Sequence, residues 1–217
     1  MASYFPLIFL LLVLPFPSHS SDPSPLQDFC VADLKSPLSI NGYPCKNPSK
    51  ITSKDFFHEG LTQNPNDYNS LGVDLLQVSV DQFPALNTMG MSMNRVAFQP
   101  GGLNPPHIHA RATELSLVTE GKLFVGWIST DYVMYWKIMS AGELFIIPPG
   151  LVHFQLNVGK GNARFYASFN SQKPGLQILG QALFNVTPMA IPDEVLTKAL
   201  LVNQTIIDLI KSKFAQQ

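Results

Sequence analysis

From residue 71 to about residue 184, the sequence consists of short runs rich in β-forming residues that are separated by turn signals. We expect strands at 88–94, 115–118, 123–128, 143–147, 152–158 and 164–169, with turns at 101–102, 120–121, 148–150 and 159–161. In 88–94 the side chains alternate between the two faces of the strand: one face carries Met89, Met91 and Met93, and the other carries Gly90, Ser92 and Asn94. Many short strands at this spacing predict an all-β sandwich or barrel rather than a parallel sheet with crossover helices.

The segments on either side of this region differ from it. Residues 22–69 are rich in Pro, Ser and Asn and have little apolar periodicity, which indicates an extended arm. Near the C-terminus, one helical pattern begins at Pro192 and a second near Asn203. These two short helices must bury their Leu and Ile faces. We expect that they pack on a neighbouring subunit, and the alternative is packing on their own barrel.

Residues 1–21 contain no Lys, Arg, Asp or Glu, and 5–14 form an apolar run that is too short to span a bilayer. This pattern predicts a signal peptide and a secreted, soluble mature protein; the alternative is a buried N-terminal strand. No second apolar stretch is long enough to span a membrane, so we expect no membrane attachment after the signal peptide is cleaved. The net charge of −1, without a basic block, argues against nucleic acid as a partner.

Cys30 and Cys45 are the only cysteines, and an oxidising compartment would pair them. Two unpaired buried thiols are the alternative. Asn185 and Asn203 each begin a glycosylation acceptor pattern, although Pro188 directly after the first makes that site less favourable. Only 13% of the residues are charged, which fits a protein that hides much of its surface against copies of itself.

The best candidates for chemistry are His107, His109, Glu114 and His153. Residues two apart on a strand point to the same side, so His107 and His109 project together. Glu114 has the wrong parity for a continuous strand, and a bend through 110–113 is needed to bring it to the same centre. Three imidazoles and one carboxylate are a ligand set for a divalent transition metal, and the set alone permits Mn, Fe, Ni, Cu or Zn.

These residues lie in two motifs that resemble the cupin motifs of plant germins and germin-like proteins. The resemblance covers nearly the whole mature chain and includes the stretches 25–33 (Pro-Leu-Gln-Asp-Phe-Cys-Val-Ala-Asp), 87–90 (Asn-Thr-Met-Gly), 111–114 (Arg-Ala-Thr-Glu), 168–175 (Ser-Phe-Asn-Ser-Gln-Lys-Pro-Gly) and 196–200 (Leu-Thr-Lys-Ala-Leu). It implies an all-β fold with short C-terminal helices: a single cupin β-jelly-roll barrel at 70–186. An N-terminal arm with the disulfide would precede the barrel at 22–69, and a helical oligomerisation segment would follow it at 187–217.

The resemblance also implies one Mn²⁺ per subunit, held by His107, His109, Glu114 and His153. It further implies a homohexamer built as a trimer of dimers, with C-terminal helices that clasp neighbours. Proteins of this family are secreted to the apoplast and cell wall and are associated with defence and stress. They include oxalate oxidases, superoxide dismutases and members without demonstrated activity.

Asn94 and Asn104 match the two pocket asparagines of the oxalate oxidase branch. Asn94 shares the Gly90 and Ser92 face, which fits a position in the lumen; the alternative is an interior amide without contact to substrate. For Asn104 the alternative is a turn residue, since two prolines follow it. Ala110 replaces the proline that usually follows the second ligand histidine, and a Lys-Gly-Asn turn at 160–162 replaces an acidic variant.

Three functions are open at this stage. The first is Mn-dependent dismutation of superoxide, which needs only an accessible redox metal. The second is oxidation of oxalate to carbon dioxide and hydrogen peroxide, with Asn94 and Asn104 holding the small anionic substrate. The third is a non-catalytic wall or receptor protein with a structural metal. Zinc-dependent hydrolysis is disfavoured because no separate general base accompanies the ligands.

Overall fold

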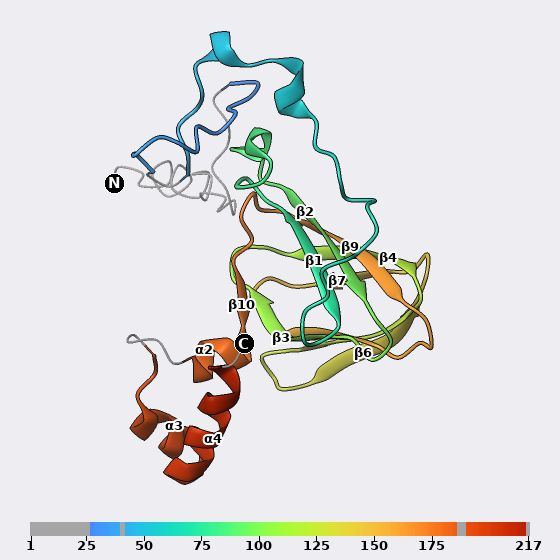
Figure 1. Cartoon of the computed structure of the whole chain (residues 1–217), viewed down its shortest axis with the longest axis vertical. Helices are drawn as coiled ribbons and strands as arrows, with labels where there is room; N and C mark the ends of the chain where they lie inside the picture. Colours follow the sequence, from blue (N-terminus) through green and yellow to red (C-terminus); the bar gives the residue numbers. More distant parts are fainter. Residues whose placement is uncertain (1–26, 40–41, 186–189, 216–217) are drawn as a thin grey trace, which may run out of the picture.

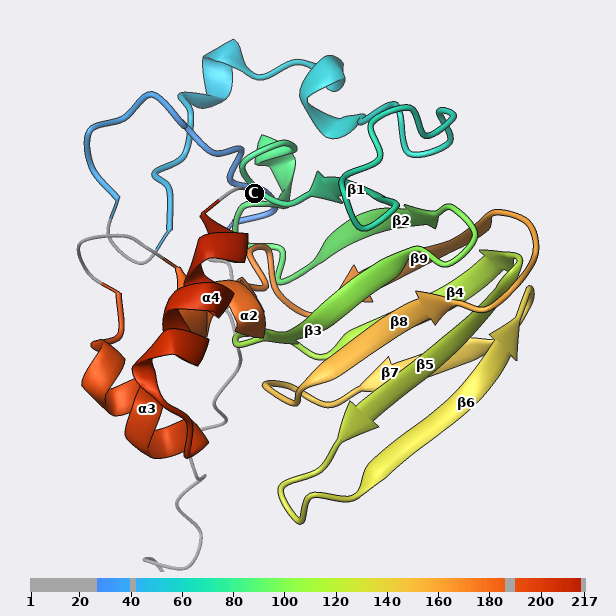
Figure 2. The same ribbon diagram turned by 60° about the horizontal axis from the view of Figure 1, so that its bottom comes forward.

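The computed structural model describes residues 27–39, 42–185 and 190–215. Ten strands form two five-stranded antiparallel sheets (Figures 1 and 2). The first sheet contains, in spatial order, β1 (Val73–Val78), β2 (Ser92–Phe98), β9 (Ala163–Phe169), β4 (Glu114–Glu120) and β7 (Leu144–Ile147). The second contains β10 (Leu176–Ile178), β3 (Leu103–His109), β8 (His153–Asn157), β5 (Lys122–Ile128) and β6 (Met134–Ser140). The predicted jelly-roll barrel is therefore confirmed.

The hydrophobic core lies between the two sheets. The first sheet contributes Phe98 and Phe165, whose rings are 5.8 Å apart, and the second contributes Leu123 and Val125. In β4 and β9 buried residues alternate with less buried ones, as expected for strands with one face on a core. The alternation expected at 88–94 is seen from 91 onward, where Ser92 and Asn94 are buried and Met91 and Met93 are exposed, but the strand β2 begins only at Ser92.

The C-terminal segment holds three helices rather than the two predicted: α2 (Leu179–Phe184), α3 (Asp193–Leu200) and α4 (Gln204–Phe214). The sequence predicted strands up to about residue 184. In the structure the last strand, β10, ends at Ile178, and α2 follows it directly. This helix has no side-chain N-cap, and it depends instead on tertiary packing, since Phe184 stacks on Phe214 and Gly180 lies against the same ring. α2 contacts β3 and β10, and α4 packs on α2 and α3 (Figure 2).

The arm crosses one end of the barrel and contains two 3-10 helices, η1 (Pro48–Lys50) and η2 (Ser53–Phe56), while η3 (Pro84–Leu86) follows β1. The expected disulfide between Cys30 and Cys45 is present. Asn185 and Asn203 are both exposed, and the Asn203 side chain caps α4 by accepting a hydrogen bond from the Ile206 amide. The predicted signal peptide at 1–21 lies outside the described residues. No helix in the described ranges is long and apolar enough to cross a membrane.

Candidate metal centre

Four ligand side chains meet inside one end of the barrel. His107 and His109 come from the end of β3, Glu114 from the first residue of β4, and His153 from the first residue of β8. The chain turns between β3 and β4, which supplies the bend that the parity of Glu114 requires. One ligand atom from each residue lies within 4.8 Å of the others, and none of the four residues is more than 6% exposed. The structure therefore brings together the four residues that the sequence predicted as ligands.

The backbone fixes which nitrogen of two imidazoles faces this centre. His107 Nδ1 lies 2.8 Å from the Pro105 carbonyl oxygen, and His153 Nδ1 lies 2.9 Å from that of Leu151. A carbonyl oxygen can only accept, so each Nδ1 must carry the proton and donate. In the neutral ring this leaves the Nε2 lone pair free for a metal, as is usual for metal-binding histidines.

The carboxylate of Glu114 faces two of these rings. Its Oε2 lies 3.2 Å from His153 Nε2 and 3.3 Å from His109 Nε2, and its Oε1 accepts a hydrogen bond of 2.7 Å from the Ser116 hydroxyl. Because the proton of a neutral His153 is on Nδ1, its Nε2 and the carboxylate oxygen would approach each other as two lone pairs. A cation between them removes this repulsion, and a divalent metal fits that requirement better than an extra proton in so buried a site.

The protonation states also suit a metal. Burial by itself raises the pKa of the Glu114 carboxyl, but His109 and His153, when their Nε2 atoms carry a proton, hydrogen-bond the carboxylate and hold its pKa well below its usual range. A metal cation in place of that proton acts in the same direction. Burial and the neighbouring His153 lower the pKa of His107 to about 3. Metal ligands must be deprotonated, and this environment keeps Glu114 anionic and His107 neutral.

A cavity of about 20 Å³ lies beside the four residues and is lined by Asn94 and Asn104 among others. A water molecule needs at least about 10–15 Å³, so this space takes only a very small group. Asn94 is 8% exposed, and its Oδ1 accepts a long hydrogen bond of 3.4 Å from the Val78 amide. Asn104 lies within β3 rather than in a turn, and its Nδ2 donates to Gln155 Oε1 at 2.7 Å.

Sequence reasoning assigned no role to three further residues at this centre. Ser116 holds the carboxylate of Glu114, Gln155 is fully buried and holds Asn104, and the Phe169 ring lies 4.5 Å from that of His109. The two-residue period of a strand could have identified Ser116 and Gln155, because Ser116 lies on the same strand face as Glu114 and Gln155 on the same face as His153. Phe169 comes from β9, and its approach depends on sheet pairing alone.

Comparison with known proteins identifies the family. The profile of the cupin family matches residues 59–208. The chain is 51% identical over 209 residues to germin-like protein subfamily T member 2 of Arabidopsis thaliana, covering 95% of this chain and 94% of that protein. This chain is a germin-like protein of the cupin family.

Solved structures also resemble this chain. A recombinant oxalate oxidase in complex with glycolate superposes with a TM-score of 0.86 at 47% identity. The matched region covers 90% of this chain and 98% of the oxalate oxidase chain. Peruvianin-I, a cysteine peptidase from Thevetia peruviana latex, superposes with a TM-score of 0.70 at 53% identity. The matched region covers 72% of this chain and 97% of the Peruvianin-I chain. Proteins similar to this one thus carry different activities, and the activity has to be argued from the site.

Proposed function

We propose that this germin-like protein is a secreted Mn²⁺ protein of the apoplast and cell wall that dismutes superoxide and acts in defence and stress. The observation that carries the proposal is the convergence of three imidazoles and one carboxylate at a buried centre. His107, His109, Glu114 and His153 would hold the metal, which would supply one-electron redox chemistry when bound. The protein's own residues keep Glu114 anionic and His107 neutral, and they limit access to small molecules.

The donor set and the cavity support this reading over other chemistries. Imidazole and carboxylate ligands without a thiolate suit a harder divalent metal such as Mn²⁺. Both cysteines are in the disulfide, so no thiol is present as a nucleophile of the kind a cysteine peptidase needs. The space beside the ligands suits a diatomic substrate, whose reaction needs no further recognition by the pocket.

Oxalate oxidation is the second candidate because a specific pair of residues favours it. Asn94 and Asn104 both line the cavity beside the ligands, where their amides could hydrogen-bond a small carboxylate. The similar oxalate oxidase binds glycolate, which is a small carboxylate of this kind. A non-catalytic protein with a structural metal remains the third candidate.

One set of assays separates these candidates. We expect the purified secreted protein to contain Mn by elemental analysis and to remove superoxide, and Asn94→Ala to leave this rate within about twofold, because no amide donor is needed for it. If the protein also forms peroxide from oxalate, Asn94→Ala should lower that rate by about 100-fold, the usual cost of removing a hydrogen-bond donor to the reacting group.

Asn162→Ala is the matched control, since Asn162 lies in an exposed turn between β8 and β9. It should change neither activity nor metal content. Full metal content without turnover of superoxide or oxalate would contradict the proposed enzyme and favour the structural metal.

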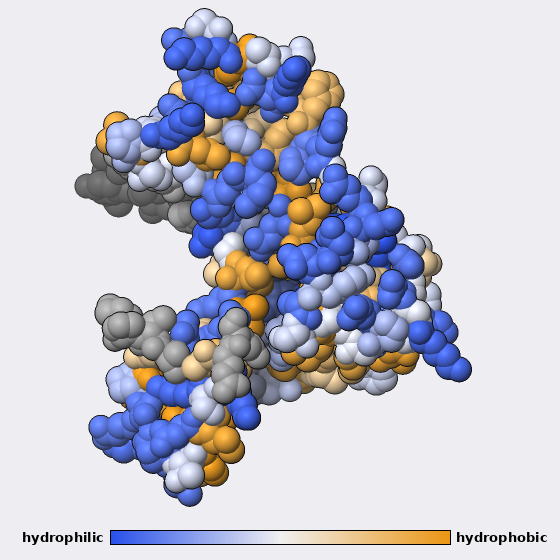
Figure 3. Space-filling model, viewed as in Figure 1, coloured by the Kyte–Doolittle hydropathy of each residue, from blue (hydrophilic) through white to orange (hydrophobic). Residues whose placement is uncertain are grey.

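The proposed assembly is a homohexamer, a trimer of dimers in which the C-terminal helices clasp neighbouring subunits. Large apolar side chains remain exposed on these helices and on β6, as the space-filling view shows for the helices and the lower edge of the barrel (Figure 3). They include Val195, Leu201 and Leu209 on the helical segment and Trp136 and Ile138 on β6. Apolar surface of this extent is typical of protein–protein interfaces.

Two charges placed on the helices test the assembly. Leu201 and Leu209 are 90% and 59% exposed, so Leu201→Glu with Leu209→Glu should leave the subunit folded. In the assembly both carboxylates would be buried without partners, and we expect the six-subunit mass to be replaced by smaller species in light scattering. Asn162→Glu adds a negative charge to a polar turn and should leave the mass unchanged. A six-subunit mass in the double variant would show that the helices do not form the contact.

A further inference from the structure

A second, larger cavity leads to the metal centre from outside the barrel. It has a volume of about 380 Å³, and three of its lining residues, Asn94, His109 and Leu176, also line the small cavity beside the ligands. Its other walls come from the end of β1 and the loop that follows it, from the turn between β3 and β4, which supplies Arg111, and from the loop between β9 and β10. We call this cavity the vestibule. A molecule that reaches His109 from the vestibule must pass the charged side chains at its walls.

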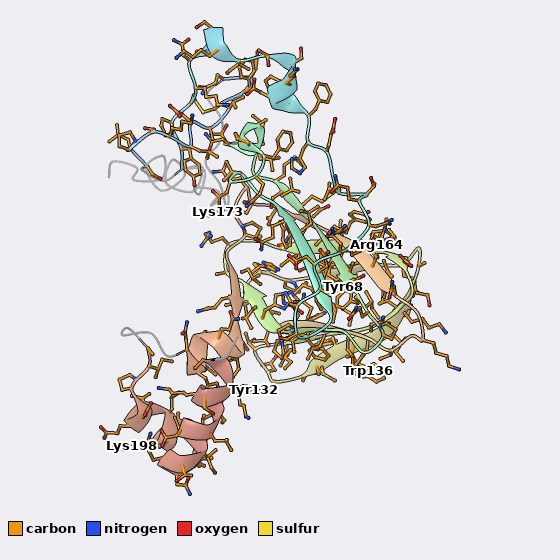
Figure 4. The ribbon with its side chains drawn as sticks, viewed as in Figure 1. Tyr68, Tyr132, Trp136, Arg164, Lys173 and Lys198 are labelled. Carbon is orange, nitrogen blue, oxygen red and sulfur yellow. A yellow bond between two sulfur atoms is a disulfide. The ribbon has the colours of Figure 1, made fainter. Side chains whose placement is uncertain are left out.

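Lys173 and Asp81 form one part of this charged wall and neutralise each other. The Lys173 ammonium lies 2.8 Å from one oxygen of the Asp81 carboxylate, and the Tyr43 hydroxyl of the arm donates to the other at 2.6 Å. The hydrogen bond to Asp81 raises the pKa of the Lys173 ammonium, so both residues of the pair are charged. Figure 4 places Lys173 on the side of the barrel between the arm and the C-terminal helices, and Figure 3 shows the molecule hollowed there.

Arg111 forms the other part of the wall and has no such counter-charge. Its Nε donates to the Lys173 carbonyl at 2.9 Å, and its backbone amide donates to the Pro174 carbonyl at 2.9 Å. Among the described residues, no carboxylate forms an ion pair with this guanidinium. With Nε used, the two terminal NH₂ groups remain, and these form the side of the guanidinium that binds a carboxylate in a two-pronged manner.

Gly175 explains why the guanidinium can lie in the vestibule wall. A Cβ at this position would come within 2.7–2.8 Å of the carbon and both terminal nitrogens of the Arg111 guanidinium. The glycine also has a φ of +77°, which other residues adopt only with strain. The backbone at 173–175 therefore accepts a hydrogen bond from the Arg111 Nε and leaves space for the rest of the guanidinium group.

From this arrangement we infer that Arg111 is a specificity-determining residue that selects small carboxylates or other small anions in the vestibule before they reach the metal centre. The two cations and one carboxylate at the walls leave one net positive charge. Charged walls around a cleft raise the local concentration of ions of the opposite sign. The inference rests on the proposed function and adds to it the class of substrate and the residue that recognises it.

Glycolate binding to the Mn²⁺-loaded full-length protein tests this role, with water-proton relaxation as the readout and elemental analysis of every variant. We expect Arg111→Gln to raise the Kd for glycolate by about tenfold, the usual effect of losing one charged hydrogen bond at a partly exposed site. Arg111→Lys keeps the charge but loses the two-pronged donor, so we expect a Kd between those of the wild type and Arg111→Gln. Lys160→Gln removes the same charge from the exposed turn beyond β8 and should have no effect.

The outcomes separate this inference from the proposed function. Equal glycolate affinity in wild type and Arg111→Gln, at equal metal content, would overturn the inference and leave the metal site intact. A similar loss in Lys160→Gln would also overturn it, because the effect would then come from overall charge. A chain without bound metal would contradict the proposed function and the inference together. Dependence on Arg111 without turnover of superoxide or oxalate would support the anion site and contradict the enzyme.

Discussion

Glu114→Gln is expected to remove metal binding from a barrel that still folds. The amide has the shape of the carboxylate, so the hydrogen bond with Ser116 can persist, but the one negative charge among the ligands is lost. Changes to groups that merely support metal ligands cost about 10–100-fold in affinity, so loss of a ligand should cost about 100-fold or more. Elemental analysis after gel filtration and a chelator-competition titration measure this loss.

Thermal unfolding gives an independent readout of the same change. A ligand that binds only the native state stabilises it by about 2.7 kcal/mol at 100 times its Kd, so added Mn²⁺ should raise the Tm of the wild type and not that of Glu114→Gln. Glu120→Gln is the matched control, because Glu120 ends the same strand but is 49% exposed and lies 3.5 Å from Arg164. Full metal content in Glu114→Gln would show that the carboxylate is not a ligand.

The part of this site that the sequence predicted best is the part governed by the two-residue period of a strand. That period places His107 beside His109, and it places Ser116 on the face of Glu114. The meeting of His107 with His153 depends on the pairing of β3 with β8, where the two lie opposite each other, and Glu114 reaches His153 from β4 of the other sheet. Spacing alone does not specify such a register, and His153 and Glu114 were assigned to the site because their residue types complete a metal-ligand set, an assignment that the resemblance to the germin motifs then supported.

Elements that depend on distant packing were not predicted. β6 was absent from the expected strands, since only Met139 of its seven residues is buried and it shows no alternation. α2 is six residues long and is stabilised by contact with Phe214, which lies 30 positions after Phe184 in the chain. The vestibule was also missed, because Arg111 and Lys173 come together through hydrogen bonds between two loops that no local pattern connects.

The same limit applies to the ion pair that joins the arm to the barrel, for which we expect a large effect on stability. Asp74 of β1 and Arg95 of β2 are 2.6 Å apart, with side chains 9% and 4% exposed. Asp74→Ala would leave Arg95 buried without its counter-charge. Such a loss typically costs about 3–5 kcal/mol, and urea unfolding should show it as a lower midpoint.

Glu194→Ala is the control for this variant, since Glu194 and Lys198 pair on the surface with 77% of each side chain exposed, and no measurable change is expected. A free energy of unfolding within about 1 kcal/mol of the wild type for Asp74→Ala would show that Arg95 finds another partner or reaches water.

The arm makes this pair different from an ordinary buried ion pair. The second oxygen of Asp74 accepts hydrogen bonds from the backbone amides of Asn66 and Asp67, at 3.0 and 3.2 Å, and Arg95 donates to the carbonyl of Gln63. Replacing both charges with apolar residues often restores the stability of a protein with a buried pair. Here Asp74→Leu with Arg95→Met should restore only part of it, because the arm amides and the Gln63 carbonyl would lose their partners. Faster proteolysis within 60–70 in the double variant would identify the arm as the segment released.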